Sequence, residues 1–266
     1  MGLTLLMVVG GIFFWRHYQI NPSTPPATTI NPKPTPQYPL VTQWQIPILM
    51  YHYIRIAPAD NTLGQNLSVN PTNFDDQMKT IVNDGYITIK MSDIADPEKK
   101  AISKIYAQKK KPIALTFDDG YEDAYSNALP ILQKYQMTAT FYIIRDYTNR
   151  PEYMNQDQIN NLTQAGFEIG SHSLSHPNLA TASETTQHSQ IFDSKAEATS
   201  FCYPSGKFND TTVNLVKNAG YTTAVTTKIG IAKETSDLLK LPRVRAEDGS
   251  AQALLDKINY AFEYGE

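Results

Sequence analysis

The sequence has little of several features that would assign it to other classes of protein. It contains one cysteine, Cys202, in 266 residues, so no disulfide can form within the chain. It has no excess of positive charge, because 23 Lys and Arg stand against 26 Asp and Glu. A net charge of -3 without a dense basic stripe gives no electrostatic basis for binding nucleic acid. No pattern indicates a protein partner either, and we interpret Cys202 as a small buried side chain.

The chain also lacks a long hydrophobic run. The longest uncharged apolar stretch, Met1–Trp15, is shorter than the roughly 20 residues that a membrane-spanning helix needs. Its length suits the apolar part of a signal peptide, so we expect residues 1–20 to be a signal anchor or an uncleaved signal segment. This predicts an extracytoplasmic protein that is either secreted or held to the cell membrane through that segment. Cleavage is left open, because no small-x-small site follows the run.

Proline is concentrated in one place. Residues Asn21–Leu40 hold seven of the 17 prolines and almost no charge, a composition typical of an extended spacer. We therefore interpret residues 21–44 as a Pro-rich linker and residues 45–266 as one globular domain.

Within that domain, short apolar runs alternate with amphipathic segments. This alternation predicts parallel strands joined by crossover helices, an α/β fold. About seven such units indicate a barrel or a large open sheet. The predicted strands are 46–54, 113–117, 139–144, 167–172, 200–204, 222–227 and 240–244, and the predicted helices are 70–86, 121–135, 155–166, 184–198, 211–220 and 250–262.

Reactive side chains fall at the ends of four predicted strands. Sites in parallel α/β folds form where the carboxyl ends of strands meet the following loops. The chain has only five histidines, and three of them lie at these strand ends beside a pair of aspartates. These candidate residues are His52, Asp118, Asp119, His172, His176, Tyr203 and Pro204.

Each of these residues has an ordinary alternative explanation. Asp118, Asp119 and the glycine after them are typical of a turn, and His52 could be a core histidine. His172 and His176 are four residues apart, which on a helix would put two imidazoles on one face, as a metal site needs. A proline follows His176 and disfavours helix there, so a loop could equally bring the pair together.

Three motifs together carry a family resemblance. The segments TFDDG at 116–120, HSLSH at 172–176 and FCYPSG at 201–206 resemble the polysaccharide deacetylase family, the NodB homology domain of carbohydrate esterase family 4. The resemblance covers about 46–262. It implies a NodB-like, distorted (β/α) barrel of about seven strands. It also implies a divalent metal, for which we expect Zn²⁺, and hydrolysis of N-acetyl groups on an N-acetylglucosamine polymer or of acetate esters on xylan.

The same match implies roles for individual residues. Asp118 would be the general base, and the metal ligands would be Asp119, His172 and His176. Three ligands of this kind leave positions on zinc for a water and for the acetyl carbonyl oxygen. A backbone N–H near Tyr203 and Pro204 would hold the oxyanion of the tetrahedral intermediate.

Two parts of the family pattern are missing. The third motif usually begins with an arginine that orients the base, and FCYPSG has none. Arg243 or Arg245, in the segment LPRVR, are the candidates to supply that guanidinium. The C-terminal Leu-x-x-His that supplies the general acid is also absent. The segment ILMYHYI resembles a permuted branch, which includes poly-N-acetylglucosamine deacetylases, and there an N-terminal histidine, here His52, takes that role.

The sequence therefore predicts a metal-dependent hydrolase that removes N-acetyl groups from a cell-surface polysaccharide of the peptidoglycan or poly-N-acetylglucosamine type. Two alternatives stay open, an O-acetyl esterase acting on xylan or another glycan and a catalytically impaired glycan-binding domain. A glycosidase is disfavoured, because adjacent carboxylates do not flank a glycosidic bond at the required separation of about 5 to 9.5 Å.

Overall fold

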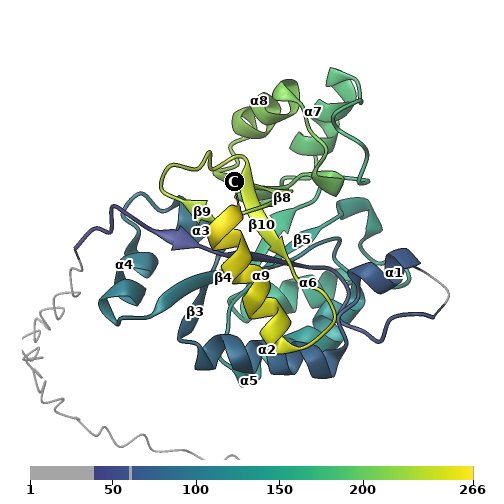
Figure 1. Cartoon of the computed structure of the whole chain (residues 1–266). Coiled ribbons are helices and arrows are strands. Elements are labelled where there is room, and N and C mark those ends of the chain that lie inside the picture. The colour runs from purple at the N-terminus through teal and green to yellow at the C-terminus, as the bar shows by residue number, and fades with distance from the viewer. Residues whose placement is uncertain (1–38, 60–61, 266) are drawn as a thin grey trace, which may run out of the picture. The chain divides into compact units, whose positions relative to one another are not determined.

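The structure, a computed structural model, describes residues 39–59 and 62–265 (Figure 1). The predicted export segment and most of the predicted linker lie outside these residues. Within the described part, no helix is long and apolar enough to cross a membrane. The last residue of the predicted linker, Trp44, is only 5% exposed and packs in a core cluster, so core packing begins just ahead of the predicted domain start.

Within the described residues, seven parallel strands close into a barrel. Their order is β2-β10-β8-β7-β6-β5-β4, and β4 pairs back with β2 to complete the ring. This confirms the predicted α/β barrel. The short strand β3 pairs with β4 only, and β1 pairs antiparallel with β9. The strands are β1 Gln45–Ile46, β2 Ile48–Tyr51, β3 Tyr86–Ile89, β4 Lys111–Phe117, β5 Thr140–Ile143, β6 Glu168–Ser171, β7 Ser200–Cys202, β8 Thr223–Ile229, β9 Ala232–Lys233 and β10 Leu241–Arg245.

Helices cover the outside of the barrel, and α2, α5 and α9 lie along one side in Figure 1. Side chains that cap helix starts explain several boundaries, because they accept hydrogen bonds from the first free backbone N–H groups. Asn70 caps α2, Asn155 caps α6 and Ser250 caps α9. The helices are α1 Thr62–Leu67, α2 Pro71–Asn83, α3 Met91–Ala95, α4 Lys100–Ala107, α5 Leu129–Lys134, α6 Gln156–Gln164, α7 Glu184–Phe192, α8 Asp210–Asn218 and α9 Ala251–Tyr264.

Three predicted elements differ clearly from the observed ones. The predicted helix 121–135 is a π-helix at Ala124–Ala128 followed by α5. The predicted strand 46–54 is divided at Pro47 into β1 and β2, because proline lacks the N–H that a continuous ladder needs. The predicted helix 184–198 ends at Phe192. The elements β3, α3 and α4, between 86 and 107, were not predicted.

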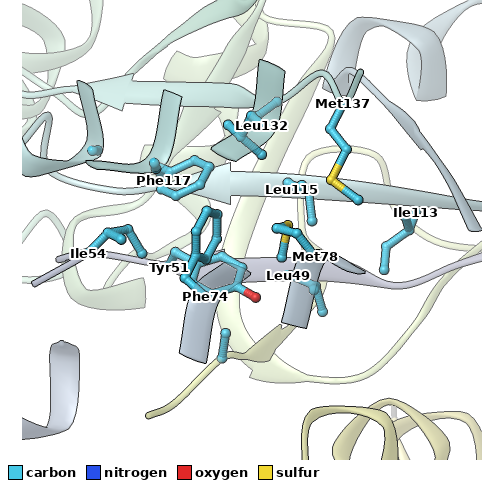
Figure 2. Packing of buried hydrophobic residues seen from close by; sticks show 14 of the residues in the cluster. Leu49, Tyr51, Ile54, Phe74, Met78, Ile113, Leu115, Phe117, Leu132 and Met137 are labelled. Carbon is cyan, nitrogen blue, oxygen red and sulfur yellow. The ribbon is translucent and has the colours of Figure 1, made fainter. Parts of the chain in front are cut away.

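A cluster of aromatic side chains fixes the two strands that carry the aspartates and His52. Figure 2 shows Tyr51 and Phe117 beside Phe74 in this cluster, and the rings of Tyr51 and Phe117 stack at 5.4 Å. These two residues are also register partners in the β2–β4 ladder. The next residue on each strand is therefore brought to the same level at the barrel's carboxyl end, and these residues are His52 and Asp118.

Close packing inside the barrel leads to a stability prediction for Gly170 in β6. A Cβ at this position would overlap the ring of Tyr142, whose hydroxyl is hydrogen-bonded to Ser200 at 2.6 Å and which is fully buried. We expect Gly170→Ala to lower the free energy of unfolding by about 1–3 kcal/mol, the usual cost of overpacking. Urea denaturation measures this, and Thr185→Ala, on an exposed site of α7, is the control expected to change stability by less than about 0.5 kcal/mol. An unchanged midpoint for Gly170→Ala would contradict the prediction.

Candidate active site

Asp119, His172 and His176 come together at the carboxyl end of the barrel. Asp119 Oδ1 lies 3.3 Å from His172 Nε2 and 3.6 Å from His176 Nε2. One ligand atom from each of the three residues lies within 4.8 Å of the others. One carboxylate and two imidazoles at such distances form a donor set that suits Zn²⁺ or a similar divalent cation.

The backbone explains how the adjacent aspartates separate. The ladder continues through Asp118, whose N–H donates to the carbonyl of Tyr51 at 2.9 Å. Asp119 and Gly120 then take positive φ angles of 72° and 80°, which turn the chain sharply. His176 also has a positive φ, 59°, and lies in a loop. The loop, not a helix, therefore brings the histidine pair together.

The hydrogen bonding of His172 fits a metal ligand. Its Nδ1 lies 2.7 Å from the carbonyl of Cys202, which can only accept, so Nδ1 carries the hydrogen and Nε2 faces Asp119. Burial disfavours the charged ring, but Cys202 and Asp119 outweigh burial and raise the pKa of His172 well above its usual value. The surroundings of His172 thus favour a positive charge at the position between its Nε2 and Asp119. A metal cation bound there would supply that charge in place of a proton on Nε2.

Asp118 forms a buried ion pair with Arg243. Two parallel hydrogen bonds join them, from Nη1 at 2.7 Å and from Nη2 at 2.8 Å, and both side chains are almost fully buried. The other N–H groups of Arg243 donate to the carbonyl of Thr226 and to the side chains of Thr116 and Cys202. Burial favours the neutral form of Asp118, but the guanidinium outweighs burial and holds the pKa of Asp118 well below its usual range.

Of the two candidate arginines, Arg243 forms the ion pair with Asp118 and Arg245 does not. β10 and β7 are separated by β8 in the barrel, and Arg243 on β10 contacts Cys202 on β7, in the segment FCYPSG that has no arginine of its own. Cys202 is 1% exposed, as predicted for a small buried side chain, and its Sγ lies 3.4 Å from Arg243 Nη2. A small residue at 202 leaves space for the guanidinium that comes from β10.

His52 lies near the carboxylate of Asp118. Its Nε2 is 3.9 Å from Asp118 Oδ2, and its side chain is 14% exposed. Burial lowers the pKa of His52, and the negative charges of Asp118 and Asp119 oppose this shift without cancelling it. His52 is therefore close enough to exchange a proton with a group bound beside Asp118.

The predicted oxyanion donor is not the N–H of Tyr203. That N–H donates to the carbonyl of Val225 at 3.2 Å, because the β7–β8 ladder continues through it, and Pro204 has no N–H. The Tyr203 hydroxyl donates to the carbonyl of Leu239 at 2.9 Å, which fixes the ring in the core. The next N–H along the chain belongs to Ser205, whose φ is 52°, and the described residues provide no acceptor for it.

Sequence reasoning missed a row of tyrosines beside the aspartates. The rings of Tyr53 and Tyr121 stack at 3.7 Å, and Tyr153 follows Tyr121 at 5.1 Å. Burial and the charge of Asp119 raise the pKa of Tyr121, so its hydroxyl keeps its proton. Only their place in the sequence could have indicated these tyrosines, since Tyr53 directly follows His52 and Tyr121 directly follows the motif TFDDG.

Comparison with known proteins identifies the family. The family model for polysaccharide deacetylases matches residues 106–224. The Bacillus subtilis relative YxkH, assigned to the polysaccharide deacetylases, is 32% identical over 217 residues, which cover 77% of this chain and 72% of YxkH. The chain belongs to the polysaccharide deacetylase family. The resemblance seen in the sequence is thereby confirmed.

Two further deacetylases are similar to this chain over most of its length. The Streptococcus pyogenes deacetylase PplD, solved in complex with acetate, is 33% identical and superposes with a TM-score of 0.72 over 81% of this chain and 99% of that one. A poly-β-1,6-N-acetyl-D-glucosamine N-deacetylase of Staphylococcus aureus is 25% identical over 73% of this chain and 72% of its own length. Membership in this family supports the deacetylation of a glycan as the class of activity.

Proposed function

We propose that this deacetylase is a metal-dependent hydrolase that removes N-acetyl groups from a cell-surface N-acetylglucosamine polysaccharide, of the peptidoglycan or poly-N-acetylglucosamine type. One observation carries the proposal. Three metal-ligating side chains converge beside a buried carboxylate, Asp118, that an arginine holds by both oxygens. A pure glycan-binding domain would need neither the ligand group nor the oriented proton acceptor.

Asp119, His172 and His176 would hold the cation, for which we propose Zn²⁺ and which, when bound, lowers the pKa of a water and polarises the acetyl carbonyl. Asp118 then accepts the proton of the attacking water. The ion pair with Arg243 keeps Asp118 ionised and fixes the plane of its carboxylate.

The departing amine and the developing oxyanion need further groups. His52 would give a proton to the amine nitrogen, which leaves poorly as an anion. The backbone N–H of Ser205 would donate to the oxyanion, a role that we assign to it because the N–H of Tyr203 is already used in the β7–β8 ladder.

His52→Ala tests the general acid. We expect it to lower turnover of an N-acetylated chitooligosaccharide at least ~10²-fold, because the amine then leaves without a proton. Hydrolysis of p-nitrophenyl acetate should be much less affected, since p-nitrophenolate leaves without protonation. Steady-state rates on the two substrates measure the difference. Equal losses on both would move the acid role to another residue.

His176→Ala tests the ligand group. Removal of one of three ligands should weaken zinc binding by more than the roughly 10–100-fold that loss of an outer-shell partner costs. Competition with a chelating dye gives the affinity, and elemental analysis gives the metal content of the purified protein. Asp118→Asn is the matched control and should keep its metal. Full zinc affinity in His176→Ala would remove His176 from the site.

The proposed function itself is tested by release of acetate. The full-length protein, loaded with zinc, is incubated in parallel with peptidoglycan, poly-N-acetylglucosamine and acetylated xylan. We expect acetate from at least one of the first two. Release from xylan alone would replace the proposal with the O-acetyl esterase, and release from none would support a glycan-binding domain.

We also propose that residues 1–20 hold the enzyme at the outer face of a membrane, with the Pro-rich spacer between them and the catalytic domain. The uncharged apolar run at the N-terminus supports this. Cell fractionation should find the full chain in the membrane fraction, where added protease can digest it in intact cells. A chain that stays in the cytosol would contradict this proposal.

A further inference from the structure

Arg245 lies between two surface pockets and follows Arg243 by two residues in β10. It is the last residue of β10. Arg245 and Glu247 are the two charged side chains that line both pockets. One pocket has a volume of about 470 Å³ and the other about 360 Å³, sizes typical of ligand sites. Gln65, Asn66 and Asp248 complete the first pocket, and Thr227, Ile229, Val244, Lys257 and Tyr260 complete the second.

The strand geometry puts Arg245 near the reacting groups. Arg245 is two residues after Arg243, so both side chains leave the same face of β10, about 7 Å apart along the strand. Arg245 is also the register partner of Met50, two residues before His52. The charge of Arg245 contributes to the lowered pKa of His52, although burial contributes more. A sugar bound against Arg245 would therefore adjoin the sugar whose acetyl group is hydrolysed.

The guanidinium of Arg245 has free donors, unlike that of Arg243. Within residues 39–59 and 62–265, no side chain or carbonyl accepts a hydrogen bond from it or forms an ion pair with it. Neither of the neighbouring acids pairs with Arg245. Glu247 pairs with Lys257 at 2.6 Å, and Asp248 accepts from the N–H of Asn70 at 3.0 Å. Arg245 is thus a half-buried cation with free donors, between a polar pocket that also holds Asp248 and a second pocket with the apolar side chains of Ile229 and Val244.

We propose that Arg245 binds the carboxylate of the sugar next to the one that is deacetylated. A guanidinium fork matches a carboxylate with two parallel, charge-assisted hydrogen bonds, which are stronger than those it makes with neutral sugar hydroxyls. The substrate would then be a glycan whose N-acetylated sugars alternate with acid-bearing ones, such as the lactyl ether of the peptidoglycan strand, and not a neutral homopolymer. This inference rests on the proposed function and narrows its substrate class.

The test compares two oligosaccharides of equal length that differ only in charge. One carries free lactyl carboxylates, and in the other the carboxylates are converted to primary amides. We expect the wild-type protein to prefer the acid at least tenfold in kcat/KM, chiefly through KM. Arg245→Gln should bring the ratio close to one, and Arg245→Lys should give an intermediate ratio. Lys217→Gln, which removes the same charge from an exposed site on α8, should keep the wild-type ratio.

Two outcomes overturn the proposal. The first is a wild-type protein without preference for the acid. The second is an equal loss on both substrates in Arg245→Gln, which would mean that Arg245 acts on the reaction through His52. If the protein releases no acetate from either oligosaccharide or from poly-N-acetylglucosamine, the proposed function fails, and calorimetric binding still decides on Arg245. A Kd for the acid at least tenfold weaker in Arg245→Gln supports the carboxylate site, and an equal Kd rejects it.

Discussion

Asp118→Asn is expected to abolish measurable acetate release, with a loss of about 10²–10⁴-fold, while the zinc content stays unchanged. The amide keeps the size of the carboxylate but cannot accept the proton of the attacking water, and general bases contribute rate enhancements of that size. The three ligand side chains do not include Asp118, so the affinity for metal should survive. The measurements are kcat on an N-acetylated chitooligosaccharide and metal content by elemental analysis.

The variant needs a control, because Asp118 is also a structural partner of Arg243. Thr116→Val removes one acceptor of Arg243, at 3.0 Å from Nη1, and leaves the carboxylate in position. We expect it to cost about 1–3 kcal/mol of stability, the usual penalty for an unsatisfied buried group, and to keep activity within about tenfold. If Asp118→Asn retains near-full activity in folded protein, another group is the base.

Short apolar runs separated by amphipathic helices predicted parallel strands in a barrel or a large open sheet, and the family resemblance decided for the barrel. The segment 86–107 was missed. Its strand β3 has four residues and is buried only at its ends, and α4 has a lysine-rich exposed side. Strand β3 therefore gives no alternating pattern, whereas Ile102 and Ile105 of α4 are buried at helical spacing, so α4 could have been predicted.

At the site, motif and chain position were enough to bring Asp118, Asp119 and the two histidines together, since the aspartates and His172 follow strand ends and His176 completes the motif HSLSH. The sequence could not decide between Arg243 and Arg245 as the partner of Asp118, because the answer depends on the register of β10 against its neighbouring strands. The β10–β8 ladder shifts between Leu241 and Arg243, and no local pattern encodes that irregularity. Which backbone N–H near Tyr203 is free for an oxyanion was not accessible for a similar reason, because the N–H of Tyr203 donates to Val225, 22 residues away in the chain.

Arg243→Met is expected to lower the free energy of unfolding by about 3–5 kcal/mol, because it leaves a buried carboxylate without its counter-charge. The loss should depend on pH. In the wild type, the pKa of Asp118 is depressed, so the ion pair's contribution is present above the unfolded pKa of about 3.9 and is lost as pH falls through the folded value. In the variant, burial alone would raise that pKa, so the penalty appears as pH rises above about 3.9. The deficit should therefore be larger at pH 7 than at pH 4, as urea denaturation at the two values can measure.

The double variant Asp118→Asn with Arg243→Met separates the charge effect from lost packing. If the buried charge causes the instability, replacing it with a neutral amide should recover most of the lost free energy at pH 7, because no uncompensated ion remains. Acetate release should stay absent, since the proton acceptor is gone. A double variant as unstable as Arg243→Met would instead assign the loss to the packing and hydrogen bonds of the arginine with Thr226 and Thr116. In that case the ion pair would orient the base without stabilising the fold.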